Sequence, residues 1–307
     1  MNRFYEHLAA ASAANRPLAL AIIAGTKGSS PQRAGAKAIF FADGKITGTL
    51  GGGCLEAEVQ ARALKALKTG QAARFDMVLD HDFGWDDGLT CGGSVSGVIL
   101  PHAADSKNLW HELTDVASTI HWGVKKDYSI ARVTENDPDE WLYRETVSPP
   151  VELWIAGSGH VAQAVAPLAL QLDFAVTVFD DRPELANHEF FPVATKLQVA
   201  GWHELLKFRP PPNSFGLIVT RGHQHDALAL SEWVHFPFGF LGVIGSRRKA
   251  RIIREQFVSK KLCTSEQFDR IACPVGLDIG AVGTHEIAVS IVAQLVQKRA
   301  ELYRPNQ

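Results

Sequence analysis

A glycine-rich turn between a predicted strand and a predicted helix constrains the fold of this chain more than any other feature. Residues 151–156 are mostly apolar, Gly157-Ser158-Gly159-His160-Val161-Ala162 follows, and apolar residues at helical spacing begin at Val161. This is the G-x-G-x-x-A pattern, in the strand–turn–helix context that makes it meaningful. It predicts a Rossmann-like domain whose helix N-terminus presents backbone N–H groups to a phosphate or another anion.

Strands and helices alternate through the rest of the C-terminal half. The predicted strands are 175–179, 215–220, 240–244 and 271–274, and the predicted helices lie near 226–235, 247–257 and 284–301. Thr264 with Gln267 fits a capping box at the start of one more helix. Such alternation predicts the α/β class, with a doubly wound parallel sheet that helices cover on both faces.

The N-terminal half has a different, mixed pattern. Residues 18–24 form an apolar run typical of a buried strand, and 37–41 with 45–50 flank a turn typical of a hairpin. Helical spacing follows Cys54, and 94–100 is another predicted strand. This half is therefore predicted to be an α+β domain.

The break between the two patterns lies before Val151. Residues 135–140 are acidic and polar, and Ser148-Pro149-Pro150 interrupts regular structure. We therefore predict an N-terminal domain over residues 1–105, a connecting segment over 106–150 and the Rossmann-like domain over 151–307.

Two of the four cysteines lie next to glycines in the N-terminal half. Cys54 follows Gly51-Gly52-Gly53, and Cys91 precedes Gly92-Gly93. Glycine lets the chain reach unusual backbone angles and lets another group come close. An accessible thiol pair of this kind favours sulfur, metal or soft-ligand chemistry, with Cys54 and Cys91 facing one cleft; the alternative is two small, buried residues beside tight turns. Lys27, Arg33 and Lys37 are candidates for a positive environment around the thiols.

Several polar residues follow predicted strands in the C-terminal half, where an open α/β sheet binds its ligands. Asp180 ends the second strand, the place of a residue that hydrogen-bonds a ribose hydroxyl. His223 and His225 could hold a metal, but they also suit hydrogen bonds at a helix N-terminus. The basic cluster at 247–249 suits a phosphate or another anion, and equally a solvated helix face. The predicted cofactor-binding residues of this half are Gly157, Gly159, His160, Asp180, Arg221, His223, His225, Asp226, Ser246, Arg247 and Asp278.

Composition narrows the classes of partner and compartment. A formal charge of −2 gives no electrostatic footprint for nucleic acid or an anionic membrane. No apolar run approaches the length of a membrane span, and the N-terminus does not have the pattern of a signal peptide. We therefore expect a cytoplasmic protein with reduced thiols and, as the commonest oligomer, a homodimer.

The order of the motifs carries a family resemblance. Along the chain they are Gly28-Ser29-Ser30-Pro31, Gly35-Ala36-Lys37, Gly51-Gly52-Gly53-Cys54-Leu55-Glu56, Cys91-Gly92-Gly93, Ala156-Gly157-Ser158-Gly159-His160-Val161, Phe179-Asp180-Asp181-Arg182-Pro183-Glu184, Thr220-Arg221-Gly222-His223-Gln224-His225-Asp226, Ile244-Gly245-Ser246-Arg247-Arg248-Lys249 and Gly276-Leu277-Asp278-Ile279-Gly280-Ala281. In this order they resemble the XdhC/CoxI family, the accessory factors of xanthine dehydrogenase and related molybdenum hydroxylases. Residues 101–150 carry no mark of that family.

The resemblance implies a function that composition does not show. Proteins of this family bind molybdenum cofactor, support its sulfuration together with a cysteine desulfurase, and deliver it to a xanthine dehydrogenase-type hydroxylase. By resemblance, Cys54 and Cys91 carry the chemistry and Cys54 is the ligand of the cofactor's molybdenum. The cofactor-binding residues implied for the N-terminal half are Gly51, Gly52, Gly53, Cys54 and Glu56.

Two other functions remain open at the level of sequence. One is an NAD(P)-dependent oxidoreductase, in which the glycine turn binds a nucleotide such as NAD. The other is a scaffold that joins a desulfurase to its client and needs neither cysteine. The small molecule that copurifies distinguishes them: a pterin with molybdenum, a nicotinamide nucleotide, or none.

Overall fold

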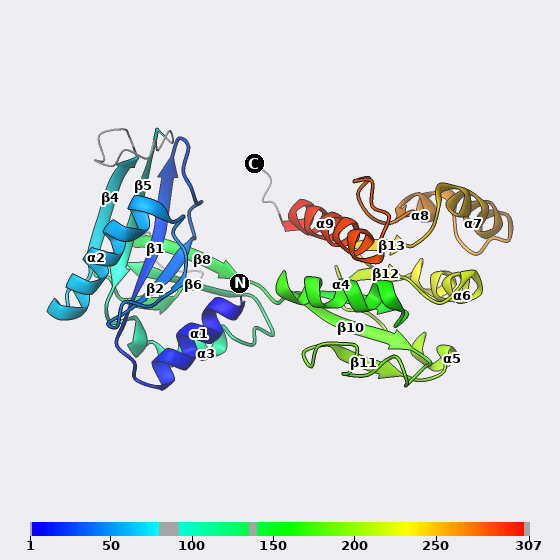
Figure 1. Cartoon of the computed structure of the whole chain (residues 1–307), viewed down its shortest axis with the longest axis horizontal. Helices are drawn as coiled ribbons and strands as arrows, with labels where there is room; N and C mark the ends of the chain where they lie inside the picture. Colours follow the sequence, from blue (N-terminus) through cyan, green and yellow to red (C-terminus); the bar gives the residue numbers. More distant parts are fainter. Residues whose placement is uncertain (1, 80–91, 135–139, 304–307) are drawn as a thin grey trace. The chain divides into compact units, whose positions relative to one another are not determined.

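The computed structural model describes residues 2–79, 92–134 and 140–303. The chain divides into two compact units, Met1–Pro149 and Pro150–Gln307, which Figure 1 shows with their helices and strands. Within the described residues, no helix combines the length and the apolar character that crossing a membrane requires.

Unit 1 is built on a five-stranded antiparallel sheet in the order β3-β2-β1-β5-β4. Its strands are β1 (Leu18–Lys27), β2 (Lys37–Phe41), β3 (Ile46–Gly48), β4 (Ala73–Leu79) and β5 (Gly93–Leu100). Helix α2 (Gly53–Thr69) covers one face, because Leu55, Val59 and Ala63 recur at helical spacing and are buried against the strands.

A smaller sheet completes unit 1. Its strands β6 (Ile120–Lys125), β7 (Ile130–Arg132) and β8 (Trp141–Val147) are antiparallel, in the order β7-β6-β8. Together with α1 (Asn2–Ala13), the 3-10 turn Ala103–Asp105 and α3 (Lys107–Glu112), they enclose a core around Tyr5, Trp110 and Trp122.

The segment that we predicted to connect two domains differs from that expectation. Residues 106–149 lie in unit 1 and provide α3 and the whole three-stranded sheet. The physical reason is the burial of Trp110 and Trp122, which are both 0% exposed and lie 5.2 Å apart between ring centroids. Burial of two large aromatic side chains favours a packed layer over a linker.

Unit 2 contains a six-stranded parallel sheet in the order β11-β10-β9-β12-β13-β14. In sequence order this is 3-2-1-4-5-6, the arrangement of a doubly wound dinucleotide-binding fold. The predicted Rossmann-like fold is therefore confirmed. The strands are β9 (Val151–Ala156), β10 (Phe174–Asp180), β11 (Lys196–Val199), β12 (Phe215–Ile218), β13 (Phe240–Val243) and β14 (Ile271–Ala272).

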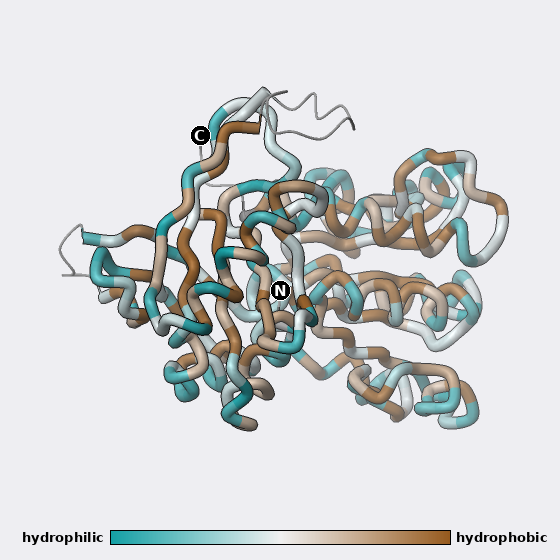
Figure 2. Tube along the Cα trace, turned by 60° about the vertical axis from the view of Figure 1, so that its left-hand side comes forward, coloured by the Kyte–Doolittle hydropathy of each residue, from teal (hydrophilic) through white to brown (hydrophobic). Residues whose placement is uncertain are grey.

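Helices cover both faces of this sheet. On one face, α4 (His160–Gln171) and α9 (Thr284–Tyr303) pack on the side chains of β9, β10 and β12. The other face is covered by α5 (Trp202–Leu205), α6 (His223–Trp233), α7 (Arg247–Ser259) and α8 (Ser265–Asp269). Figure 2 shows the hydrophobic stretches running along the strands, with hydrophilic residues concentrated at turns and helix surfaces. Because the six strands are parallel, their carboxyl ends lie at one edge of the sheet, and the loops described below follow those ends.

Candidate functional site

A glycine turn leads directly into Cys54. Gly51, Gly52 and Gly53 have φ angles of 114°, 74° and 59°, a left-handed run that residues with a side chain rarely adopt. A Cβ at Gly51 would lie 2.6 Å from the Cβ of Pro31, whereas a Cβ at Gly52 or Gly53 would meet nothing within 4 Å. The turn is therefore packed tightly at Gly51 and open at the two residues that precede the thiol.

Glu56 fastens this turn from the first turn of α2. Its Oε2 accepts hydrogen bonds from the Thr49 hydroxyl at 2.8 Å and from the Leu50 N–H at 2.9 Å. The Gly51 N–H in turn donates to Thr49 Oγ1 at 3.0 Å. The geometry therefore supports a positioning role for Glu56, rather than a carboxylate free to contact a cofactor.

Cys54 lies in the first turn of α2 and is half-buried. The first turn of a helix favours a negatively charged group. Cys263 is buried and Cys273 is half-buried, and burial raises the pKa of both thiols. Cys91, the other predicted chemical residue, lies outside the described residues.

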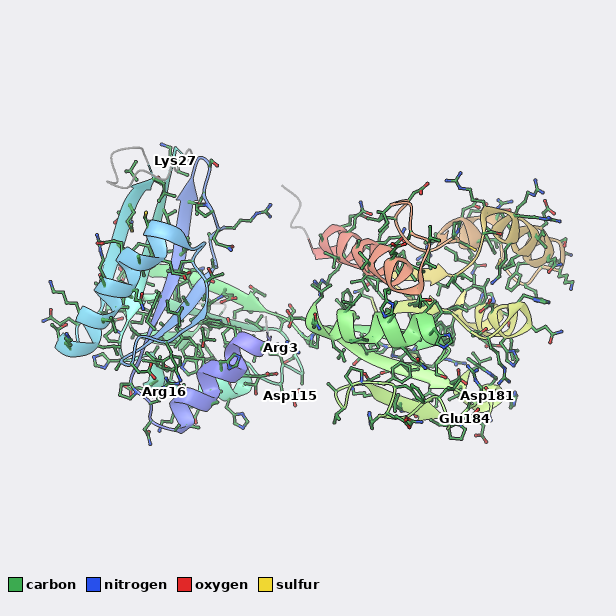
Figure 3. The ribbon with its side chains drawn as sticks, in the orientation of Figure 1. Arg3, Arg16, Lys27, Asp115, Asp181 and Glu184 are labelled. Atoms are coloured by element: carbon green, nitrogen blue, oxygen red, sulfur yellow. The ribbon has the colours of Figure 1, made fainter. Side chains whose placement is uncertain are left out.

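Lys27 and Lys37, two of the basic residues predicted to surround the thiols, lie in different surroundings. Lys37 is buried and its Nζ lies 2.8 Å from Glu145 Oε1, so a carboxylate neutralises its charge. Burial lowers the pKa of Lys37, and Glu145 opposes that shift. Lys27 is the last residue of β1 (Figure 3).

The segment 28–36 brings the N-terminal motifs together. A Cβ on Gly28 would lie 3.1 Å from the Gly93 Cα, and Ser29 forms a parallel bridge with Gly92. Further along the same segment, Pro31 packs on Gly51. The glycines beside both cysteine positions thus contact a single loop, although they are far apart in the sequence.

In unit 2, the turn between β9 and α4 has the form that its sequence predicts. Gly157 has a φ of 112° and donates its N–H to the Phe179 carbonyl at 2.8 Å. A Cβ there would lie 2.6 Å from the Val219 carbonyl oxygen, so only glycine allows this approach to the β12 loop. Gly159 caps α4 and faces open space, and His160, the first residue of the helix, is exposed.

Asp180 has hydrogen-bond partners for both carboxylate oxygens. It accepts from the Ser158 N–H at 2.7 Å and from Nε and Nη2 of Arg182, each at 2.8 Å. Burial raises the pKa of Asp180, but the hydrogen bonds from Arg182 and Ser158 outweigh this effect and lower it to about 2. Asp180 is 1% exposed, so it braces the glycine turn and leaves little access for the ribose hydroxyl that we had assigned to it.

The β12 loop and the start of α6 divide into an exposed and a buried part. Arg221 Nη2 lies 2.9 Å from Asp181 Oδ2 and 3.2 Å from His225 Nε2, all near the carboxyl end of β10 and β12 (Figure 3 labels Asp181). His223, the first residue of α6, is exposed. Within the described part of the chain, no group of three or more metal-ligating side chains is present.

Asp226 takes a structural position that sequence reasoning missed. It is 1% exposed, lies 2.6 Å from Lys249 Nζ, and accepts a 2.6 Å hydrogen bond from the Thr220 hydroxyl. The Asp226–Lys249 ion pair joins the end of the motif at 220–226 to the end of the motif at 244–249. Asp226 is thereby committed to Lys249 and Thr220 rather than left free for a cofactor.

The predicted basic cluster begins helix α7. Ser246 caps the helix by accepting a hydrogen bond from the Lys249 N–H at 3.2 Å. Arg247 forms a 3.1 Å ion pair with Asp278, and both side chains are exposed. The structure thus brings Ser246, Arg247 and Asp278 to the same edge of the sheet as the glycine turn.

Two models of one family match this chain. The model described as the XdhC Rossmann domain matches residues 153–295, and the one described as the XdhC and CoxI family matches residues 11–79. The chain belongs to the XdhC/CoxI family.

Curated relatives of the chain agree with this family. A protein from Bacillus subtilis, described as a probable subunit of xanthine dehydrogenase, is 27% identical over 97% of this chain and 98% of its own length. The molybdenum cofactor insertion chaperone PaoD from Escherichia coli is 23% identical over 89% of this chain and 80% of its own length. The uncharacterized protein YqeB from Escherichia coli is 30% identical over 92% of this chain, which spans only 44% of that relative.

A solved structure shares the whole architecture. A crystal structure from Bacillus halodurans, described as a xanthine dehydrogenase, has a TM-score of 0.83 and 25% sequence identity. The match covers 99% of this chain and 97% of that one. The match therefore extends over both units, including the part of unit 1 that follows residue 105.

Proposed function

We propose that this protein binds molybdenum cofactor, supports its sulfuration together with a cysteine desulfurase, and delivers it to a xanthine dehydrogenase-type hydroxylase. The observation that carries the proposal is the half-buried Cys54 thiol, placed after two glycines that face open space. The names of two relatives, a cofactor insertion chaperone and a probable part of a xanthine dehydrogenase, support the same role.

The chemistry of the described residues fits such a cargo. A thiolate is a soft donor that suits a molybdenum centre or sulfur transfer. The absence of side chains at Gly52 and Gly53 leaves room for a bulky group beside Cys54. When bound, the cofactor brings a metal and a phosphate; Cys54 would hold the former, and glycine N–H groups at a helix N-terminus suit the latter.

An NAD(P)-dependent oxidoreductase has less support. The acidic residue at the end of the second strand normally contacts the ribose of the nucleotide. Here Asp180 is buried and hydrogen-bonded to Arg182 and Ser158. A nucleotide at this edge would have to find its ribose contact elsewhere.

The copurified ligand tests the proposal. The full chain is expressed in cells that make molybdenum cofactor, and the purified protein is denatured and oxidised. We expect pterin fluorescence and molybdenum in a constant ratio to protein. A nicotinamide nucleotide in their place would favour the oxidoreductase. Delivery is tested by mixing the loaded protein with cofactor-free hydroxylase, which should gain activity. Free cofactor, added without the protein, should not restore that activity.

A further inference from the structure

Strand β4 (Ala73–Leu79) forms one margin of the five-stranded sheet of unit 1 (Figure 1). Within residues 2–79, 92–134 and 140–303 it pairs with β5 alone, over all seven of its residues and without a shift of register. It contains no proline, which would interrupt pairing at such an edge. A long, regular edge strand is a template on which another strand can pair.

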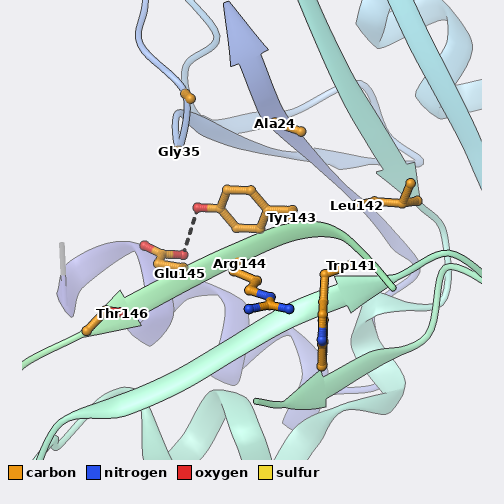
Figure 4. Close-up of a pocket in the computed structure, with 9 residues that line it drawn as sticks. Ala24, Gly35, Trp141, Leu142, Tyr143, Arg144, Glu145 and Thr146 are labelled. Carbon is orange, nitrogen blue, oxygen red and sulfur yellow. Dashed lines mark hydrogen bonds between the residues drawn. The ribbon is translucent and has the colours of Figure 1, made fainter. Parts of the chain in front are cut away.

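The other edge strands of unit 1 are less suited to a partner. Strands β3 and β7 have three residues each. Strand β8 has seven, but it borders a cavity of about 680 Å³, and Ala24 and Gly35 of the same unit lie across that cavity (Figure 4). The edge of β8 therefore faces its own unit, whereas β4 is a long edge strand at the outside of unit 1.

A hydrogen bond at the end of β4 indicates which of its peptide groups the sheet does not use. Leu79 accepts this bond from the Gly92 N–H at 3.0 Å, so its peptide groups are directed toward β5. Peptide groups alternate in direction along an antiparallel strand. Arg74, Asp76 and Val78 therefore direct their backbone N–H and C=O groups away from β5.

The far side of β5 leads to the same alternation. Ile23 of β1 exchanges hydrogen bonds with the segment that leads into β2, so Ile22 directs its peptide groups toward its β5 partner Val98. Gly97 is consequently directed toward β4, where its partner is Phe75. Phe75 thus uses its peptide groups within the sheet, and its two neighbours in β4 do not.

The residues with outward peptide groups also carry the exposed side chains of β4. Arg74, Asp76 and Val78 are exposed, whereas the residues between them are buried in the core under α2. Arg74 Nε lies 3.2 Å from Asp76 Oδ2, and these two side chains are 56% and 66% exposed. An ion pair this exposed stabilises a single chain little, so both charges can also serve a partner.

We propose that a second copy of this chain docks on the edge of β4, strand to strand and antiparallel, with Arg74 opposite the partner subunit's Asp76. Two-fold symmetry then places Asp76 opposite the partner subunit's Arg74. The four charges alternate in sign around the axis, and opposite charges directly across a strand pair are stabilising. Both residues of each pair have outward peptide groups, so each pair can exchange two main-chain hydrogen bonds.

The charges select this register and favour a second copy as the occupant. A shift of two residues in one direction would place Arg74 opposite its own copy, and a shift in the other direction would do so for Asp76. Like charges directly opposite each other are destabilising. A shift of one residue would set outward peptide groups against inward ones. The charge pattern of the edge is thus its own complement, which a second copy always supplies.

Charge reversal tests the dimer and its register together. Analytical ultracentrifugation of the full chain measures the dissociation constant for the parent, Arg74→Glu, Asp76→Arg and the variant that carries both changes. Each single change makes all four charges alike, so we expect dimers at least about tenfold weaker. The double variant restores opposite charges and should dimerise within about threefold of the parent. An equimolar mixture of the two single variants should form heterodimers, because each negative side chain then faces a positive one.

Two controls separate the loss of the dimer from other effects. Both positions are exposed, so the single variants should unfold at the parent's temperature. Arg254→Glu reverses an exposed, ion-paired arginine of unit 2 and should leave the dimer unchanged. A monomeric parent, or single variants that dimerise as tightly as the parent, overturns the proposal. A mixture no tighter than its components would mean that the register is wrong, which also overturns it. None of these outcomes depends on cofactor binding, so the proposed function stands or fails separately.

Discussion

At the scale of single residues, a glycine turn held by the side chains of Pro31 and Glu56 determines where the Cys54 thiol lies. Gly51 is packed against Pro31, while Gly52 and Gly53 are open, and Glu56 holds the preceding residues by two hydrogen bonds. Sequence analysis identified the glycines and the thiol. It did not identify Glu56 as the residue that holds the turn. The hydrogen bonds that Glu56 accepts from Thr49 and Leu50 depend on how the turn closes.

Replacement of Cys54 by serine tests the thiol directly. Serine preserves the volume of the side chain but removes the soft donor, so molybdenum retained by the purified protein should fall at least about tenfold. The midpoint of thermal unfolding should stay the same. Cys263→Ser is a matched control at a buried thiol, and it should retain molybdenum. Parent-level molybdenum in Cys54→Ser would mean that Cys54 only packs the turn.

The glycines of the turn should differ in their tolerance of alanine. Gly52→Ala places a methyl group in open space, so its cost is that of the backbone alone: φ of 74° with ψ of −169° is a conformation adopted almost only by glycine, and it costs about 1–3 kcal/mol. Gly51→Ala adds a clash with Pro31, worth about 1–3 kcal/mol, to a backbone cost of the same order. Urea unfolding of the two variants measures the difference. Equal free energies of unfolding would show that Pro31 moves away easily.

At the scale of elements, the carboxyl edge of the unit 2 sheet is braced by hydrogen bonds and ion pairs between neighbouring loops. Asp180 joins the end of β10 to the turn before α4, and Asp226 with Lys249 joins α6 to α7. Sequence patterns placed all these residues at one edge. They could not show which acidic residue has a basic partner, because that depends on packing between elements distant in sequence.

The low pKa of Asp180 makes the stability of unit 2 depend on pH. Its folded-state pKa is about 2, below the ordinary value of 3.8. The stabilisation is therefore present above the unfolded value and is lost as pH falls from about 4 to about 2. Asp180→Asn should lower the free energy of unfolding at neutral pH and flatten its dependence on pH in that window. Asp181→Asn is the control, because the Ser158 N–H donates to Asp180 and not to Asp181. Urea titrations at several pH values give the comparison.

The predicted elements were most accurate where apolar periodicity was long. The strand 151–156, the helix starting at 284 and the capping box at Thr264 are confirmed. Helices α1, α3 and α5 and strands β4, β6, β7, β8 and β11 were not predicted. Four of these, α3, α5, β7 and β11, have only three to six residues, and the partly exposed character of β7 and β11 leaves little alternation to detect.

At the scale of the whole molecule, the two units have separate cores and a short connection. The last residue of β8 is Val147 and the first of β9 is Val151, so Ser148, Pro149 and Pro150 alone connect these strands. Each unit has its own buried clusters, two in unit 1 and two in unit 2.

Unit 2 should therefore fold on its own. A fragment of residues 150–307 should be monodisperse and should unfold cooperatively in a calorimeter. Its transition temperature should lie close to one of the transitions of the full chain. A matched fragment that starts at residue 106, which carries β6–β8 without the rest of unit 1, should expose that apolar layer and aggregate. An insoluble 150–307 fragment would contradict the independence of the units.

The glycine turn before Cys54 also has a consequence for motion. Glycine has more freedom in the unfolded chain than other residues, so three in succession make this turn costly to order. Helix α2 ends in left-handed Gly70 as well, and its buried face rather than its ends must hold it in place. Amide hydrogens at residues 51–54 should therefore exchange with solvent faster than those of the buried turns of α2. A bound ligand that engages the turn would slow this exchange, so the occupancy of the thiol site can be followed without any measure of catalysis.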